Sequence, residues 1–479
     1  MFLTREQIKS VQEASLELLD RTGMAVMNVP AREMMQQAGC NVSGERVRIP
    51  QDIVRRAIAS VPRTFRLHSR DGDRSFVIGG KNVMFNPGSS AATFLDSSTK
   101  DIRPGTAADL VKLVKVADAL EYIDAQSTAL IPTDVPEKIQ DLYRLNLVLR
   151  NSDKPIVTGA FTKEGLLDMV HMLEAAVGSP EDLAKKPRAI FDCCPVSPLT
   201  WGDITPQNLM DCAERMVPAE IIPAPMMGAT SPVTIFGTLI QSNAEVLSGI
   251  VISQLKRPNA PVVYGGSLAL FDMKYGMICL GAIETAMAAC ASAEIGKSYR
   301  IPTQAYLGLS DSKMPDAQSG FESAIGLLLA GITGINVVSG PGMLAFENCQ
   351  STEKLAIDNE ICGMVKRLLR GLETEDVGSV LSLLDSVGPR GEFLSADHTL
   401  SKFRSEQFMP SDITCRRPVN SWKELGGSDA YKRASGRVDK ILSVHKPKTL
   451  PEARERSLDG AIASILKKHS VSPEALPRV

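Results

Sequence analysis

Short apolar runs alternate with longer amphipathic segments through the middle of the chain. Each run breaks into glycine, serine, asparagine or aspartate, and a segment with helical spacing follows. The runs predict strands at 83–86, 123–130, 155–161, 188–193, 220–226, 261–265, 302–307 and 335–339. The segments predict helices at 106–120, 136–150, 163–177, 206–217, 234–255, 275–298, 316–329 and 351–370, with Thr205 capping the fourth. A short buried strand, a polar loop and a helix form the repeating unit of a parallel α/β sheet.

Eight such units predict a (β/α)8 TIM barrel over residues 83–371, because a barrel of this kind spans about 250 residues. An open doubly wound sheet is the alternative. Against it, no G-x-G-x-x-G follows the first strand, and no acidic residue completes a nucleotide-binding unit. Residues 1–82 predict an N-terminal cap of helices and hairpins, which starts with a capping box between Thr4 and Gln7. Residues 372–479 predict a C-terminal helical region.

Composition and charge narrow the class of protein. The 479 residues include 53 basic and 55 acidic side chains, a balance that gives no case for nucleic acid or an anionic membrane as partner. The nine cysteines follow no regular spacing, as in reduced cytoplasmic proteins. The first residues turn charged quickly, unlike a signal peptide, and no run approaches the roughly 18 apolar residues that cross a bilayer. We expect a soluble, cytoplasmic enzyme.

The strand ends carry few of the familiar catalytic patterns. Cys193 and Cys194 end one strand, but no C-x-x-C or H-x-C motif that would complete a zinc site lies nearby. No G-x-S-x-G elbow marks a serine hydrolase. Most other residues at the strand ends are small, amide-bearing or hydroxyl-bearing, so we expect an open mouth that suits a large planar partner.

Acidic and aromatic residues cluster after the last three strands. A cage of aromatic faces and carboxylates is typical of a site for a quaternary ammonium group. Each residue also has a structural reading: Asp316 as a helix cap, Asp311 as a partner of Lys313, and the aromatics as packing. The candidate substrate-binding residues are Tyr264, Phe271, Tyr306, Asp311, Lys313, Asp316, Glu322, Phe346, Glu347 and, further along the chain, His398.

Several segments resemble the trimethylamine methyltransferase superfamily, in its branch without pyrrolysine, which includes the glycine betaine:corrinoid methyltransferases. The matching segments are 226–234 (MMGATSPVT), 243–251 (NAEVLSGIV), 261–266 (PVVYGG), 310–322 (SDSKMPDAQSGFE), 351–360 (STEKLAIDNE) and 388–394 (GPRGEFL). The resemblance implies a TIM barrel that docks a separate corrinoid-binding protein and transfers a methyl group from an amine to Co(I). It also implies a homo-oligomer.

The resemblance further implies a quaternary amine as substrate, because an ordinary residue replaces the pyrrolysine of the trimethylamine enzymes. Glycine betaine, proline betaine and carnitine are the candidates. Co(I) of the partner protein is the nucleophile, so we expect no catalytic side chain, no bound metal and no tightly bound cofactor; the corrinoid arrives with its own protein. A betaine carboxylate would find donors in Lys313, Arg390 or His398.

Two other functions remain open from the residues. A related barrel enzyme could use a zinc-activated methyl donor, with Cys193, Cys194 or His398 as ligands. A non-catalytic subunit could instead bind a small cation without turnover.

Overall fold

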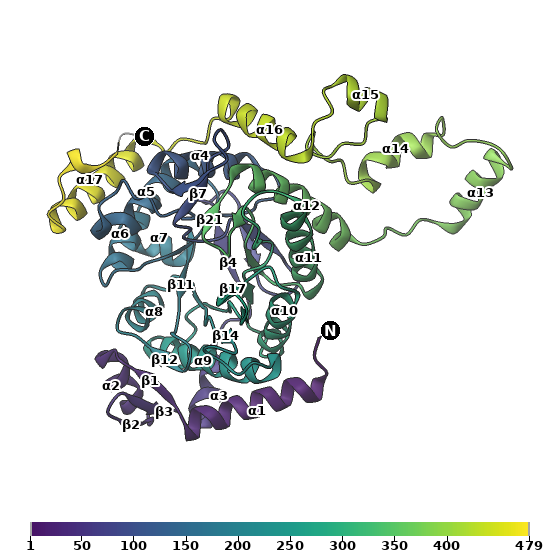
Figure 1. The fold of residues 1–479 in the computed structure, drawn as a ribbon. Helices are drawn as coiled ribbons and strands as arrows, with labels where there is room; N and C mark the ends of the chain where they lie inside the picture. The colour runs from purple at the N-terminus through teal and green to yellow at the C-terminus, as the bar shows by residue number, and fades with distance from the viewer. Residues whose placement is uncertain (1, 478–479) are drawn as a thin grey trace.

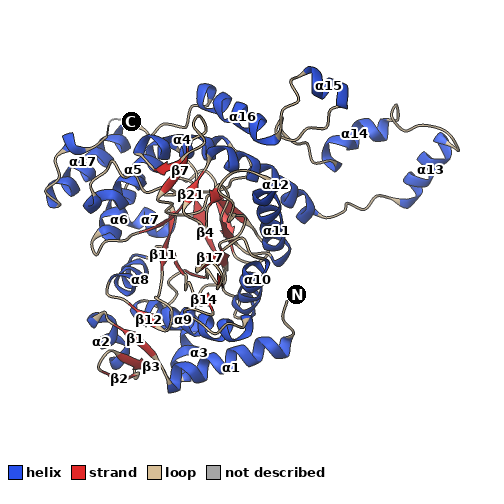
Figure 2. Cartoon of the chain, viewed as in Figure 1, coloured by secondary structure: helices blue, strands red, loops and turns tan. Residues whose placement is uncertain are grey.

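Eight parallel strands form the centre of the computed structural model, which describes residues 2–477 (Figures 1 and 2). The strands are β6 (Met84–Asn86), β9 (Gln126–Ser127), β10 (Ile156–Gly159), β11 (Ala189–Cys193), β13 (Ala219–Ile221), β15 (Val262–Tyr264), β18 (Gln304–Ala305) and β19 (Val337–Ser339). The helices that follow them are α4 (Ala107–Ala119), α5 (Gln140–Asn151), α6 (Gly165–Val177), α8 (Ile204–Arg215), α9 (Ile235–Lys256), α10 (Ile283–Ser298), α11 (Ala317–Thr333) and α12 (Thr352–Arg370). A short helix, α7 (Pro180–Lys185), follows α6.

The ring of strands closes. One arc runs in the order β15-β13-β11-β10-β9 and the other in the order β18-β19-β6. A parallel bridge between Tyr264 and Thr303 joins the arcs on one side. On the other side, the amides of Asp124 and Ala125 donate to the Phe85 carbonyl at 2.8 and 3.2 Å. The predicted (β/α)8 barrel is therefore confirmed.

Three details of the sequence prediction are wrong. The strand predicted at 220–226 ends at Ile221, because Pro223 and Pro225 have no N–H for the ladder, and Met226–Met227 (β14) belongs to another sheet. The helix predicted from 275 begins at Ile283, since the chain first forms a hairpin of β16 (Ala269–Asp272) and β17 (Met277–Cys279). Helix α8 begins at Ile204, one residue before the expected cap Thr205.

The N-terminal segment covers one flank and the lower end of the barrel. Its elements are α1 (Arg5–Arg21), β1 (Met24–Val26), α2 (Val29–Gln37), β2 (Asn41–Ser43), β3 (Arg46–Arg48), α3 (Gln51–Ser60), β4 (Phe65–His68) and β5 (Ser75–Ile78). The expected capping box starts α1, where Thr4 and Gln7 bond reciprocally. Helices α1 and α3 pack on α9, and β1 pairs with β12 (Thr200–Trp201). The β4–β5 hairpin closes the lower end of the barrel with Leu67 and Ile78.

Helix α9 is long and apolar enough, by length and composition, to cross a membrane. In the structure 78% of its most apolar window is buried, and α1, α3 and α8 pack against it. Such a helix is a core element of the barrel.

Two small sheets stand above the mouth of the barrel, at the carboxyl ends of the strands. One has the order β20-β21-β7-β8, from β20 (Met343–Leu344), β21 (Cys349–Gln350), β7 (Thr93–Leu95) and β8 (Ile102–Pro104). The other has the order β14-β16-β17. Together they hold the loops that shape the mouth.

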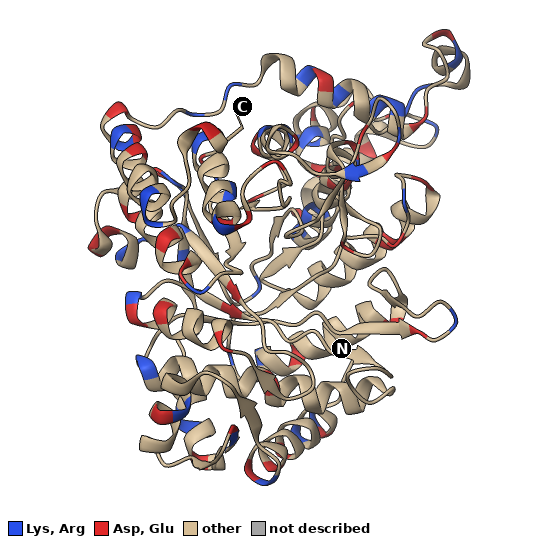
Figure 3. Ribbon diagram, turned by 60° about the vertical axis from the view of Figure 1, so that its left-hand side comes forward, with Lys and Arg blue, Asp and Glu red and all other residues tan. Residues whose placement is uncertain are grey.

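The C-terminal segment has two parts. Helix α16 (Ala430–Val444) packs on α4 and α12, and α17 (Glu452–Lys468) packs on α6. Between α12 and α16, the helices α13 (Val377–Val387), α14 (Asp397–Glu406) and α15 (Val419–Glu424) form an arm that extends away from the barrel (Figure 1). Basic and acidic residues are interspersed along the chain (Figure 3).

Candidate functional site

The barrel interior has an apolar lower layer and a polar upper layer. The lower layer contains Met84, Ala125, Val157, Ile190, Val263 and Val337, packed on the β4–β5 hairpin. Side chains along a strand alternate between faces, so Asp192 shares the inward face of Ile190. Glu220 lies directly opposite Asp192 on the neighbouring strand and therefore also points inward. The sheet register thus places two carboxyls side by side in the upper layer.

A cavity of about 520 Å³ opens above this layer. It lies at the carboxyl ends of the strands, where TIM barrels hold their active sites. Its lining is mostly small or aromatic, with two carboxyls. The lining residues are Ser89, Ser90, Gly159, Ala160, Phe161, Asp192, Cys194, Thr205, Tyr306, Phe346, Glu347 and Asn348.

The carboxyls of this site have pKa values above their ordinary range. Burial raises the pKa of Asp192 to about 6, against the opposing influence of Glu220, Arg144 and the Tyr306 hydroxyl. Burial raises the pKa of Glu347 to about 8, and the charge of Asp192 adds to the effect. Burial first, and the neighbouring Asp192 second, raise the pKa of Glu220 well above its ordinary value. Burial therefore disfavours the charged form of each of the three carboxyls.

Few protein groups compensate these carboxyls. Within residues 2–477, no ion pair joins a basic side chain to Asp192, Glu220 or Glu347. Glu220 and Asp192 share a side-chain hydrogen bond in which the protonated Glu220 is the donor, and no other described donor reaches either oxygen of Glu220 or Oδ1 of Asp192. The buried guanidinium of Arg144 lies nearby but is already paired with Asp141 at 3.0 Å. Buried carboxyls without a basic partner are rare in proteins, and Asp192 of this pair lines the cavity.

The loop between β20 and β21 presents two of the lining residues in a strained conformation. Ala345, Phe346 and Glu347 have φ values of 50°, 61° and 66°, in the left-handed region that non-glycine residues avoid. The Ala345 amide donates to the Ser312 carbonyl at 2.8 Å, and the Asn348 carbonyl accepts from the Thr93 amide at 3.0 Å. Strain of this kind collects at functional sites, where the surrounding structure imposes it.

Three of the sequence candidates meet at the cavity: Tyr306, Phe346 and Glu347. The Tyr306 hydroxyl contacts Asp192 at 3.5 Å and Ser89 at 3.1 Å. Lys313 lies beside them, with its Nζ 4.1 Å from the centre of the Phe346 ring. These four candidates and Asp192 form one connected group.

The other candidates lie elsewhere. Tyr264 follows the inward-facing Val263, so its side chain points outward, and its hydroxyl donates to Asn243 of α9 at 3.0 Å. Phe271 belongs to the β16–β17 hairpin and does not line the cavity. His398 lies on the arm and pairs with Glu375 at 3.0 Å. Tyr264 and Phe271, which the sequence placed in an aromatic cage, therefore do not line this cavity.

Three acidic candidates accept hydrogen bonds from backbone amides of the protein. Asp311 accepts from the Leu280 amide at 3.0 Å, and burial raises its pKa to about 6. Asp316 caps α11 by accepting from the Ser319 amide at 2.9 Å, as the alternative reading expects. Glu322 accepts from the Asp311 amide at 2.9 Å and from Ser310 Oγ at 2.5 Å. They brace the loop that carries Lys313.

Sequence reasoning missed Asp192, Glu220 and the contribution of Phe161. The signal was available for two of them, since a charged residue within a fully buried strand is costly unless it serves a purpose. One face of the Phe161 ring is already covered by the guanidinium of Arg144, whose Cζ lies 5.1 Å from the ring centre.

The two cysteines that suggested a zinc site point in different directions. Cys193 is buried outward beside Cys212 of α8, whereas Cys194 lines the cavity. With His398 on the arm, these three residues do not converge on one ligand position.

The fold and site define a TIM-barrel enzyme with an acidic, aromatic mouth, and comparison with known proteins gives the family. Residues 1–470 match the family described as Trimethylamine methyltransferase (MTTB). A glycine betaine methyltransferase of Desulfitobacterium hafniense is 32% identical over 463 residues, which cover 96% of each chain. A trimethylamine methyltransferase of the same species is 29% identical over 98% of this chain and 94% of its own.

A solved structure agrees in fold. The monomethylamine methyltransferase of Methanosarcina barkeri matches with a TM-score of 0.54 at 14% identity, over 98% of this chain and 89% of its own. The chain belongs to the trimethylamine methyltransferase family, whose members are corrinoid-dependent methyltransferases.

Proposed function

We propose that this protein transfers a methyl group from a quaternary amine, glycine betaine first among the candidates, to Co(I) of a separate corrinoid protein. One observation carries the proposal: Asp192 and Glu347, which no basic side chain in residues 2–477 pairs with, line an open cavity at the barrel mouth, and burial raises the pKa of both. A cation that enters the cavity supplies the missing counter-charge. A site built for an anion or a neutral amine would not need this arrangement.

The chemistry of a quaternary amine suits the side chains present. Loss of a methyl group leaves a neutral tertiary amine, so the leaving group needs no general acid. Co(I) supplies the nucleophile when the corrinoid protein docks, so the protein's own residues bind and orient the substrate. The Tyr306 and Phe346 rings and the carboxyls of Asp192 and Glu347 line the space where a trimethylammonium group would sit.

The mouth also suits the approach of a planar cofactor carried by another protein. Ser89, Ser90, Gly159 and Ala160 line one side of the cavity with small side chains. Small residues leave room for a wide ring above the substrate. The cofactor and its protein are thus assigned to the upper face, and the protein itself is expected to hold no tightly bound group.

Lys313 is the residue we assign to the carboxylate of a betaine. Its ammonium donates to the Asp311 carbonyl at 2.8 Å and lies against the Phe346 ring, at the edge of the cavity. It therefore stands next to the proposed ammonium site while keeping donors for an anion. Arg390 and His398, the other donors expected from sequence, are on the arm.

The decisive test is methyl transfer itself. The protein is mixed with free cob(I)alamin and glycine betaine, and both the methylated corrinoid and dimethylglycine are measured. Equal amounts of the two products are expected, with proline betaine and carnitine as weaker or inactive donors. Turnover of trimethylamine without turnover of any quaternary amine would overturn the proposal. The cytoplasmic location that we expect follows from this chemistry, because Co(I) survives only in reducing surroundings.

A further inference from the structure

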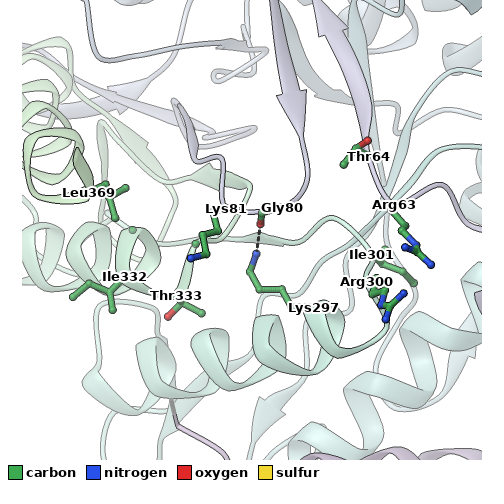
Figure 4. A pocket seen from close by; sticks show the side chains of 12 residues that line it. Arg63, Thr64, Gly80, Lys81, Lys297, Arg300, Ile301, Ile332, Thr333 and Leu369 are labelled. Atoms are coloured by element: carbon green, nitrogen blue, oxygen red, sulfur yellow. Dashed lines mark hydrogen bonds between the residues drawn. The ribbon is translucent and has the colours of Figure 1, made fainter. Parts of the chain in front are cut away.

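A second cavity lies at the lower end of the barrel, away from the mouth. It has a volume of about 690 Å³ (Figure 4). Its lining includes the loops that lead into β6, β18 and β19, so it lies at the amino ends of these strands. Pockets for small molecules commonly measure about 300–1,000 Å³. The cavity therefore has the size of a ligand site, and the proposed methyl transfer does not use it.

Four cations line this cavity: Arg63, Lys81, Lys297 and Arg300. Within the described part of the chain, no aspartate or glutamate lines the cavity or forms an ion pair with any of the four. The ammonium of Lys297 donates to the Gly80 carbonyl at 2.8 Å, and burial lowers the pKa of this lysine. An anion in the cavity would supply the missing counter-charge.

Cations near helix ends often only offset the helix dipole, and this accounts for part of the set. Lys297 lies in the last turn of α10, and the cavity also reaches Gly334, which ends α11. The carboxyl end of a helix carries about half a negative charge, so the two ends together carry about one. Four cations exceed this charge, and Arg63 and Lys81 come from loops outside both helices. A surplus of positive charge therefore remains at the cavity.

Arg300 occupies a backbone position that usually belongs to glycine. Its φ is 63°, its amide donates to the Lys297 carbonyl at 2.9 Å, and the Ile301 amide donates to the Gly296 carbonyl at 3.2 Å. These two bonds form a Schellman motif at the end of α10, whose left-handed residue is most often glycine. An arginine at this position accepts backbone strain that glycine would avoid. The strained position places one more guanidinium at the cavity.

The cavity has an apolar end and a cationic end. Figure 4 shows Leu369 and Ile332 at one end and Arg63 with Arg300 at the other, while the two lysines lie between them. Ile332 and Leu369 are 63% and 41% exposed, so their side chains are open to a ligand. A ligand that matches both ends carries several negative charges on one side and an apolar group on the other.

We propose that this cavity binds an organic polyphosphate of the nucleoside diphosphate or triphosphate class. The phosphate chain lies among the four cations, which donate charge-assisted hydrogen bonds to its oxygens. The base lies on Ile332 and Leu369. Because the cavity and the mouth are at opposite ends of the barrel, this site is separate from that of the methyl donor.

Isothermal titration calorimetry of the full chain with ATP, tripolyphosphate and inorganic phosphate, in buffer without divalent cations, tests the proposal. ATP is expected to bind about tenfold or more tightly than tripolyphosphate, because only ATP also covers the apolar end. Saturating glycine betaine should leave the affinity for ATP unchanged. ATP that does not bind, ATP that binds no more tightly than tripolyphosphate, or competition by glycine betaine would each overturn the proposal.

Two substitutions to glycine separate a specific site from general surface charge. Arg300→Gly removes a guanidinium where glycine fits the backbone, so the melting temperature without ligand should hold while the affinity for ATP falls about tenfold. Lys100→Gly is the matched control, because Lys100 is also exposed, has a φ of 62° and lies in the β7–β8 turn above the mouth. The control should bind ATP as the parent does. No loss of affinity in Arg300→Gly, or equal losses in both variants, would overturn the proposal.

Discussion

The two ends of the barrel interior have opposite compositions although the same strands build both. At the lower end, Val157, Ile190 and Val263 pack with the β4–β5 hairpin and leave no charged group. At the upper end, Asp192 of β11 and Glu220 of β13 lie side by side on neighbouring strands. Removing these two carboxyls from water costs free energy. The lower end stabilises the barrel, whereas the carboxyls of the upper end lower its stability and, on the proposed function, bind the substrate. Substitutions at the two ends should therefore affect stability and activity in opposite ways.

The largest expected effect is on stability, at the lower end. Ile190→Ala removes a fully buried side chain and should lower the free energy of unfolding by about 2–5 kcal/mol. Thermal unfolding followed by circular dichroism measures the loss. Activity per folded molecule should stay close to that of the parent, and a large fall in activity without a fall in melting temperature would contradict the division between the two ends.

At the upper end the expected effect is on activity. Asp192→Asn should lower kcat/KM for a quaternary amine about 100-fold, which corresponds to about 2.7 kcal/mol, because the cation loses its nearest counter-charge. The melting temperature should hold or rise, since a desolvated carboxyl without a basic partner is removed. Asp272→Asn, in the exposed β16–β17 turn, serves as control. Equal losses in both variants would contradict a specific role for Asp192.

The carboxyls of the upper end also predict opposite pH dependences for stability and binding. Burial raises the pKa of Asp192 to about 6 and that of Glu347 to about 8, so the folded protein holds protons that the unfolded chain releases at lower pH. Stability of the ligand-free protein should therefore fall as pH rises from about 4 through 8. Affinity for a cation should rise over the same interval, because binding requires the ionised form. Melting curves with and without glycine betaine measure both trends, and parallel trends would contradict the assignment.

The smallest effects separate the two tyrosines that sequence proximity grouped together. Tyr264→Phe removes the bond to Asn243 and should cost about 1 kcal/mol of stability without changing KM. Tyr306→Phe removes the hydroxyl that contacts Asp192 and Ser89, so it should raise KM. Steady-state kinetics and thermal unfolding of both variants check this. A KM change in the Tyr264 variant would place that side chain in the site after all.

The fold was largely accessible from sequence because each βα unit has a local signature. Each of the eight predicted strands and eight predicted helices overlaps an observed one, although several of their bounds differ. The errors arose where two proline residues ended a strand and where a hairpin preceded α10.

The site was accessible only in part. Tyr306, Phe346 and Glu347 follow strand ends closely enough to be found by proximity. Tyr264 was misassigned because proximity ignores the alternation of side chains, which one count from Val263 would have corrected. Asp192 and Glu220 meet through the register of two strands separated along the chain by α8, and register is a tertiary property. The position of His398 depends on the path of the arm, which no local pattern encodes.

The central claim is that positive charge on the substrate is what the barrel mouth recognises. Glycine betaine and 3,3-dimethylbutanoate have the same shape and the same carboxylate, but the second has a neutral carbon in place of the charged nitrogen. Isothermal titration of the protein with each compound at pH 8 tests the claim directly. Binding of glycine betaine at least tenfold tighter than 3,3-dimethylbutanoate, with the preference lost in Asp192→Asn, is the predicted result; equal affinity for the two compounds would contradict it.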